Sequence, residues 1–158
     1  MKRVKVIIKL DKENNPATEA VKLAMLSENE QQVFNVIKES LVLAKQKFKV
    51  TFELLPFKMN LLGTTAGQYC KDMIHGDYYR FNEYIMEHND NFNNTIRHEI
   101  AHYITIELFG HNIQAHGWEW KMVAKSINCS AEVTHKMKHV SAKQQRIWMQ
   151  KKQRSSNT

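Results

Sequence analysis

The stretch Phe92-Asn-Asn-Thr-Ile-Arg-His-Glu-Ile-Ala-His-Tyr-Ile-Thr-Ile-Glu-Leu-Phe109 carries the strongest structural signal in this chain of 158 residues. Its apolar residues recur at the three- and four-residue spacing of one helix face: Phe92, Ile96, Ile100, Tyr103 and Ile104. Gly110 follows directly and is typical of a helix end. The spacing predicts a helix over residues 92–109 that buries one side and lines a cleft with the other.

Within this stretch, His98-Glu-Ile-Ala-His102 forms an H-E-x-x-H motif, and both histidines project away from the apolar stripe. Residues four apart lie one turn apart on the same helix face, so both imidazoles can reach one zinc ion. Glu99 can then act as the general base that takes a proton from the attacking water. A pair of structural histidines is the alternative interpretation.

A zinc site of this kind needs a third protein ligand further along the chain. The metzincin pattern fails, because Thr105 and Leu108 stand where its glycine and third histidine belong. The remaining candidates are His111, His116, Glu119 and Glu132. His116 directly precedes Gly117 and a second predicted helix over about 117–127, so spacing favours it while leaving the others open.

Upstream of this helix, the patterns predict a mixture of strands and one long helix. Lys2–Leu10 alternates like a strand and leads into a polar linker over residues 11–16. A helical pattern runs from Thr18, and Ser27-Glu-Asn-Glu30 resembles a capping box that restarts it. Three further short strands are expected at Val50–Leu54, Gly63–Cys70 and Asp77–Phe81. The layout is therefore α+β.

Composition excludes several classes of protein. Apolar residues make up 42% and charged residues 25%, which is ordinary for a globular domain and argues against disorder of the whole chain. No run of about 18 apolar residues exists, so we expect no membrane span. Cys70 and Cys129 are too few for a disulfide scaffold. We expect an intracellular, cytoplasmic protein, with nucleoid or nuclear association left open.

The net charge of +7 is concentrated at one end of the chain. All 16 acidic residues precede residue 136, whereas residues 136–158 hold only cations: Lys136, Lys138, Lys143, Arg146, Lys151, Lys152 and Arg154. Such a segment can neutralise phosphates without reading sequence, and Trp148 could stack on a base. The segment is thus a candidate nucleic-acid contact. The alternatives are a solvated tail and a Trp148 anchor that packs it onto the body.

Four segments together resemble the SprT/Spartan family of zinc metalloproteases. They are Thr64-Thr-Ala-Gly-Gln68, Arg80-Phe-Asn82, His98-Glu-Ile-Ala-His102 and His116-Gly-Trp-Glu-Trp-Lys-Met122, spread over about residues 30–135. The resemblance implies His98, His102 and His116 as ligands of one zinc ion and Glu99 as the catalytic acid/base. It also implies a zincin-like core with an N-terminal helix, a small antiparallel sheet, the H-E-x-x-H helix and a following helix.

The resemblance divides the chain into an N-terminal strand and linker (1–16), a metalloprotease domain (17–135) and a basic tail (136–158). Family members often carry a cysteine-rich zinc ribbon, but no cysteine follows Cys129 here. Two expectations follow: the basic tail takes over the contact with DNA, or the dependence on DNA is lost.

The expected function is a zinc-dependent metalloendopeptidase that acts on DNA-associated or DNA-crosslinked proteins as a monomer, with single-stranded DNA as the favoured partner. Two alternatives stay open. One is a regulatory protease that cleaves a repressor, which a glutamate third ligand would favour. The other is a non-catalytic nucleic-acid-binding protein with structural zinc, in which Glu99 would be dispensable.

Overall fold

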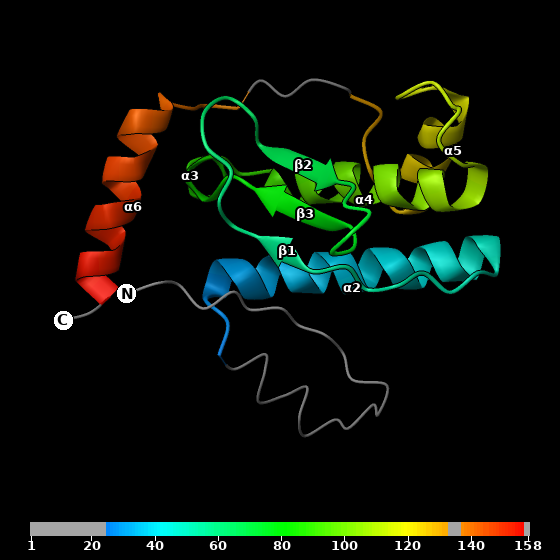
Figure 1. Ribbon diagram of the computed structural model, residues 1–158, viewed down its shortest axis with the longest axis horizontal. Coiled ribbons are helices and arrows are strands. Elements are labelled where there is room, and N and C mark those ends of the chain that lie inside the picture. Colours follow the sequence, from blue (N-terminus) through cyan, green and yellow to red (C-terminus); the bar gives the residue numbers. More distant parts are fainter. Residues whose placement is uncertain (1–24, 133–136, 157–158) are drawn as a thin grey trace.

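The computed structural model describes residues 25–132 and 137–156, which form five helices and three short strands (Figure 1). In chain order these are α2 (Glu28–Phe48), β1 (Phe57–Lys58), β2 (Gly67–Cys70), β3 (Tyr78–Phe81), α3 (Glu83–Glu87), α4 (Phe92–Phe109), α5 (Trp118–Ser126) and α6 (Ala142–Ser156). The predicted Lys2–Leu10 strand and the start of the helix predicted from Thr18 lie outside the described residues. The α+β class is confirmed.

Helix α2 begins at the predicted capping box. The Ser27 hydroxyl accepts a hydrogen bond from the Glu30 amide at 3.2 Å, and the Glu30 carboxylate accepts one from the Ser27 amide at 3.3 Å. These bonds satisfy two of the backbone amides that a helix start leaves without partners. The helix then buries an apolar stripe that includes Val33, Ile37 and Ala44. Capping and stripe together place α2 along the whole length of the core.

The sheet is mixed, which corrects the prediction of an antiparallel sheet. Its strand order is β1-β3-β2. Strands β2 and β3 form the predicted antiparallel hairpin, with Tyr69 opposite Tyr79. Strand β1 instead runs parallel to β3, with Phe57 opposite Tyr79. Strand direction depends on a partner about 20 residues away, so the local alternation of β1 could not reveal it.

The strand predicted at Val50–Leu54 is also wrong. Residues 50–56 carry no strand, and β1 begins only after Pro56. Phe52 and Leu55 are buried while Thr51 and Glu53 are exposed. The segment packs its apolar side chains on the core, and its first backbone contact with β3 is at Pro56, whose carbonyl accepts a hydrogen bond from the Tyr79 amide at 3.0 Å.

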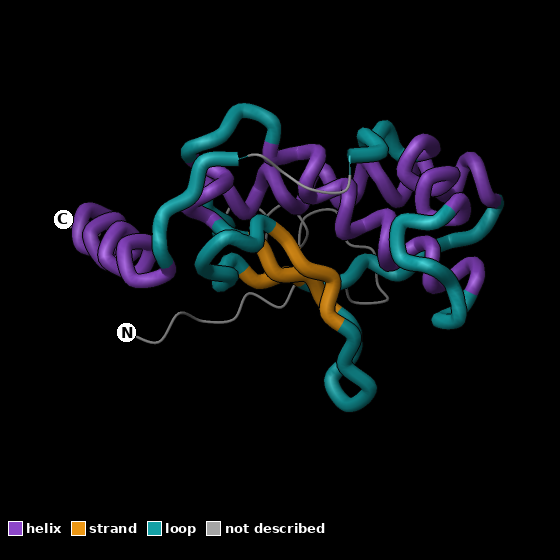
Figure 2. Tube along the Cα trace, turned by 90° about the horizontal axis from the view of Figure 1, so that it is seen from above, coloured by secondary structure: helices purple, strands orange, loops and turns teal. Residues whose placement is uncertain are grey.

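Helix α4 occupies the centre of the fold and has the predicted bounds. It packs against α2, α5 and β2, and Ile96, Ile100 and Ile104 are completely buried. Seen from above, the helices lie on one side of the sheet, and α6 stands apart at one end of the molecule (Figure 2). One face of α4 is thus buried in the core, while His98 and His102, on another face of the helix, remain partly exposed.

Helices α3 and α6 were not predicted. Helix α3 begins at Asn82, whose side-chain oxygen accepts a hydrogen bond from the Ile85 amide at 3.1 Å. Helix α6 lies within the predicted basic tail. None of the helices in the described part of the chain combines the length and the apolarity needed to cross a membrane.

Candidate metal centre

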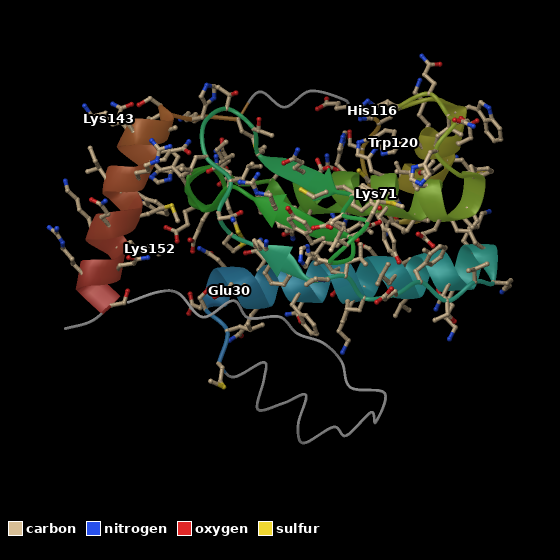
Figure 3. The ribbon with its side chains drawn as sticks, viewed as in Figure 1. Glu30, Lys71, His116, Trp120, Lys143 and Lys152 are labelled. Carbon is tan, nitrogen blue, oxygen red and sulfur yellow. The ribbon has the colours of Figure 1, made fainter. Side chains whose placement is uncertain are left out.

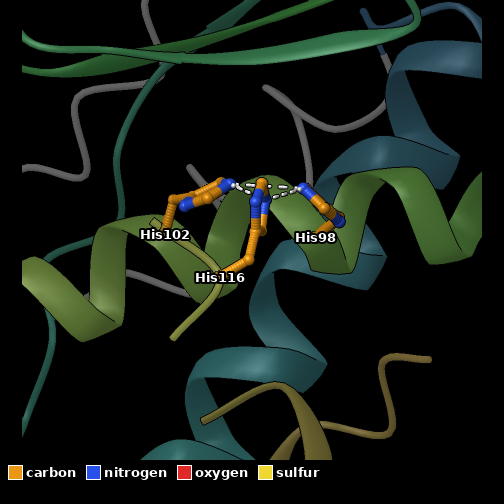
Figure 4. Close-up of side chains that lie close together, drawn as sticks. All are labelled: His98, His102 and His116. Carbon is orange, nitrogen blue, oxygen red and sulfur yellow. Dashed lines mark hydrogen bonds between the residues drawn. The ribbon is translucent and has the colours of Figure 1, made fainter. Parts of the chain in front are cut away.

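Three imidazoles converge beside α4 (Figure 4). His98 and His102 stand one turn apart on this helix, and His116 reaches them from the loop before α5. The Nε2 atom of His116 lies 3.0 Å from each of the other two Nε2 atoms, which are 3.2 Å from one another. Within the described residues, this is the cluster whose donor atoms suit a metal ion.

The spacing and charge state of these nitrogen atoms fit a divalent metal. Zn–N bonds of about 2.0–2.1 Å in tetrahedral geometry separate two ligand nitrogens by about 3.3 Å, close to the separations here. Burial and the neighbouring imidazoles lower the pKa of His98 to about 4 and that of His102 to about 3. Burial also lowers the pKa of His116. Neutral imidazoles offer the lone pairs that metal binding requires.

A tight turn presents His116. Its backbone is left-handed, with φ of 58°, and the amide of Gly117 donates to the Gln114 carbonyl at 3.0 Å. A Cβ atom on Gly117 would lie 3.0 Å from that carbonyl oxygen and 3.1 Å from a carboxylate oxygen of Glu119. A side chain after the histidine would therefore crowd the turn that aims this imidazole back at α4, and glycine avoids this contact.

Glu99 is held from the other side, by the sheet. Its side chain is 9% exposed, and one carboxylate oxygen accepts a hydrogen bond from the Tyr69 amide of β2 at 2.9 Å. Burial raises the pKa of Glu99 to about 7, although this hydrogen bond opposes the rise. A Cβ atom on Gly67 would lie only 3.0 Å from the Glu99 Cγ atom. Sequence reasoning missed Gly67 and Tyr69 because their contact with Glu99 spans more than 25 residues.

Trp120 packs against all three imidazoles from α5. The centroid of its indole lies 4.7 Å from that of His98, 5.7 Å from that of His102 and 4.8 Å from that of His116. Trp120 is 1% exposed, whereas Trp118, two residues earlier on α5, is 67% exposed. One buried indole therefore contacts all three imidazoles of the cluster.

The other third-ligand candidates are not part of this cluster. His111, Glu119 and Glu132 all lie in described segments, but the group of donor atoms contains only His98, His102 and His116. Spacing along the chain favours His116 without excluding the others, and the structure adds the turn that brings His116 back over α4.

A family model described as the SprT-like family matches residues 24–139 of the chain. The chain belongs to the SprT-like family. The resemblance inferred from the four sequence segments is thereby confirmed. The matched residues include α2 through α5, hence the histidine cluster, and end before α6.

Curated SprT-like relatives cover part of the chain. Protein SprT from Pseudomonas fluorescens strain Pf-5 is 31% identical over 99 residues, which are 61% of this chain and 58% of that protein. Protein SprT from Pseudomonas savastanoi pv. phaseolicola is 35% identical over 86 residues, 53% of this chain and 51% of that protein. The chain thus aligns with little more than half the length of these relatives. No solved structure matches it.

Helix α6 follows the residues that match the SprT-like family. Two of its side chains that were predicted to contact nucleic acid, Trp148 and Lys152, instead pack α6 against α3 and the residue after it. The Trp148 ring lies 5.3 Å from that of Tyr84 and 5.6 Å from that of His88. The Lys152 ammonium forms ion pairs with Glu83, at 3.2 Å, and with Glu87. For Trp148, this geometry matches the anchor interpretation.

A buried glutamine completes the docking of α6. Gln145 is completely buried, and its side-chain oxygen accepts hydrogen bonds from the Gly63 amide at 2.8 Å and from the Asn82 side chain at 3.1 Å. Its side-chain nitrogen donates to the Gly63 and Val140 carbonyls at 3.0 and 3.1 Å. The side-chain amide of Gln145 thus pairs with both the N–H and the C=O group of Gly63.

The remaining predicted tail cations that the structure describes are exposed: Lys138, Lys143, Arg146, Lys151 and Arg154. Lys143 lies near the start of α6 and Lys152 towards its end (Figure 3). Lys136 lies outside the described residues. At 100° per residue, Lys143, Arg146 and Arg154 fall on the side opposite Gln145, Trp148 and Lys152, and Lys151 lies at the edge of that side. We call this side the outer face of α6.

Proposed function

We propose that the chain is a zinc-dependent metalloendopeptidase in which His98, His102 and His116 hold one zinc ion. The observation that carries the proposal is the convergence of their three Nε2 atoms at 3.0–3.2 Å, one residue away from a buried glutamate. A zinc ion bound there would polarise the scissile carbonyl and lower the pKa of water. Three protein ligands leave a coordination position open, as hydrolytic zinc sites require.

In this proposal Glu99 is the general base. The Tyr69 amide holds one of its carboxylate oxygens, at 2.9 Å, and so fixes the orientation of the carboxylate. The second oxygen is then left to take a proton from the attacking water and to pass it to the leaving amine. Glu99 thereby moves the proton, and strand β2 keeps the carboxylate in one position between the two transfers.

The proposed substrates are DNA-associated or DNA-crosslinked proteins. Support for this choice comes from the outer face of α6, where Lys143, Arg146, Lys151 and Arg154 are exposed. Lys143 and Arg154 are eleven residues apart, so the cations extend along about 16 Å of helix. Phosphates of a nucleic acid neutralise such a row by releasing their counterions. A protein bound to the same nucleic acid would then be concentrated near the protease.

The experiment that tests the proposal follows cleavage of a DNA-binding protein on a gel, with and without single-stranded DNA. Wild type is compared with Glu99→Gln, which keeps the size of the side chain and removes the base. We expect Glu99→Gln to lose activity by about 10²-fold or more, while zinc analysis still finds one ion per chain. Equal activity of both proteins would contradict the role of Glu99.

The same assay separates proteolysis from the contribution of DNA. Cleavage that requires single-stranded DNA would support a DNA-directed protease. Cleavage at the same rate without DNA would support the peptidase activity and contradict the proposed role of nucleic acid. Zinc-loaded wild type that cleaves nothing under either condition would overturn the proposed enzyme.

A further inference from the structure

The three imidazoles share a single packing partner. The Trp120 indole lies within 4.7–5.7 Å of every imidazole centroid, tilted against His98 and His102 and edge-on to His116. It belongs to α5, four residues after His116, and packs against two residues of α4 that are one turn apart. One rigid ring therefore contacts ligand candidates from two separate parts of the chain.

Within the described residues, a hydrogen bond to the backbone is found for one of these rings, that of His98. Metal-binding histidines usually donate their second ring nitrogen to a carboxylate or a carbonyl, which fixes the rotation of the ring. The His98 imidazole has a hydrogen bond with the backbone of Glu132. For His102 and His116, no protein group in residues 25–132 or 137–156 hydrogen-bonds Nδ1, and the polar contacts of these two rings join Nε2 atoms within the cluster.

We propose that Trp120 is a positioning residue, whose indole sets the rotation of the His102 and His116 imidazoles so that their Nε2 atoms converge. This inference rests on the proposed function, because it concerns the affinity of the same histidines for zinc. Trp120 itself binds neither metal nor substrate. It acts through the two rings, in the place where other zinc sites use hydrogen bonds.

The environment of Trp120 supports a role that depends on ring shape. The side chain is 1% exposed, so its position is tightly constrained by the core. Its Nε1 atom is buried and has no hydrogen-bond partner in the described part of the chain. No hydrogen bond in the described part of the chain therefore fixes the orientation of the indole. The unpartnered N–H group also costs stability. Packing of the flat ring against the imidazoles is what the site obtains from this residue.

The test measures zinc affinity of the purified full chain by competition with a chelator. Trp120→Phe keeps a flat ring and removes the N–H group, whereas Trp120→Met fills the space with a flexible chain. Phe92→Met is the matched control, because Phe92 is equally buried, at 2% exposure, and its ring packs on Phe81. The melting temperature of each metal-free protein is recorded alongside, so that loss of folding is recognised.

We expect Trp120→Phe to bind zinc within about threefold of wild type and Trp120→Met to bind about 10- to 100-fold more weakly. Phe92→Met should bind like wild type even if it melts earlier. Cobalt absorption provides a second readout, since the d–d bands of Trp120→Met should depart from those of wild type, Trp120→Phe and Phe92→Met.

Zinc affinity and cobalt spectra of folded Trp120→Met that equal those of wild type would overturn the inference. So would a tenfold or larger loss in Trp120→Phe, a comparison that decides the matter if Trp120→Met does not fold. Wild type without measurable zinc binding would instead contradict the proposed function, so the two failures are distinguishable.

Discussion

His116 adopts a backbone conformation that residues with a side chain rarely take. Its φ of 58° is left-handed, and the flanking turn closes through the Gly117 amide. Strain of this kind persists where the surrounding structure enforces it, commonly at functional sites. The imidazole therefore reaches the other two histidines at a cost in stability, which substitutions at this position can measure.

The comparison of His116→Gly with His116→Ala isolates that cost. Both variants lose the imidazole, but only glycine adopts a φ of 58° without strain. We expect metal-free His116→Gly to be more stable than His116→Ala by about 1 kcal/mol, measured by urea unfolding. Both should bind less zinc than wild type. An alanine variant as stable as the glycine variant would contradict strain at this position.

At the scale of elements, the β2–β3 hairpin is held by its acidic residues. Asp77 accepts hydrogen bonds from the Tyr69 hydroxyl and from the Asp72 amide, and Lys71 lies 3.4 Å away. Burial opposes ionisation of Asp77, but these donors outweigh it and lower its pKa below the ordinary value of 3.8. The ionised form is thus preferred more strongly in the folded protein than in the unfolded chain.

This shift predicts how acid affects stability. Because the folded pKa is the lower one, Asp77 contributes stability that is present above the unfolded pKa and is lost as pH falls through the folded pKa. We expect the free energy of unfolding to decrease from about pH 5 to about pH 3, and Asp77→Asn to flatten this decrease. Urea unfolding across this range measures it. A decrease of the same size in Asp77→Asn as in wild type would contradict this role of Asp77.

Helix α6 depends on one buried polar side chain. Replacing Gln145 with leucine would leave the Gly63 amide without the partner it has at 2.8 Å. We expect the free energy that holds α6 on the body to decrease by about 1–3 kcal/mol, so that α6 opens locally more often. Hydrogen exchange should then be faster in α6 and unchanged in α4. Gln153→Leu, an exposed position on the same helix, should change neither, and equal exchange in both variants would contradict the docking role of Gln145.

The elements that sequence could predict are those with a local apolar signal. Helix α4 and the capping box of α2 follow from spacings within a few residues, and so does the pairing of His98 with His102. Helix α6 has no such signal, because its only fully buried side chain is a glutamine. For His116, spacing only favours it as a ligand, and the family resemblance implies it. The direction of β1 and the contact between Tyr69 and Glu99 depend on residues far apart in the chain, and local patterns carry no information about these two.

At the scale of the molecule, the histidine cluster and the outer face of α6 belong to different parts of the fold. The cluster lies between α4 and α5, whereas α6 packs on α3 at one end (Figure 1). Proteolysis and nucleic-acid binding should therefore respond to separate substitutions. Under the proposed function, a variant of the outer face would lose DNA binding while its zinc affinity stays unchanged. Glu99→Gln would lose proteolysis while it keeps both zinc and DNA binding.

Salt dependence of DNA binding measures the number of cations involved. Four phosphate contacts to a single strand contribute about −2.8 to the slope of log affinity against log salt concentration. We expect the variant Lys143→Gln, Arg146→Gln, Lys151→Gln, Arg154→Gln to lose about this much slope, together with any DNA-stimulated cleavage, while cleavage without DNA is unchanged. Binding is followed by fluorescence anisotropy of a labelled oligonucleotide between low and moderate salt.

The matched control removes four exposed lysines from the body: Lys45, Lys47, Lys121 and Lys125. Both variants carry four fewer positive charges, so a general effect of net charge would change their slopes equally. Counterions are released only where phosphates contact cations. If DNA binds to the outer face of α6, the salt slope should therefore decrease only in the variant that lacks the α6 cations. Equal slopes for the two would therefore exclude α6 as the binding surface, even if the whole protein binds DNA.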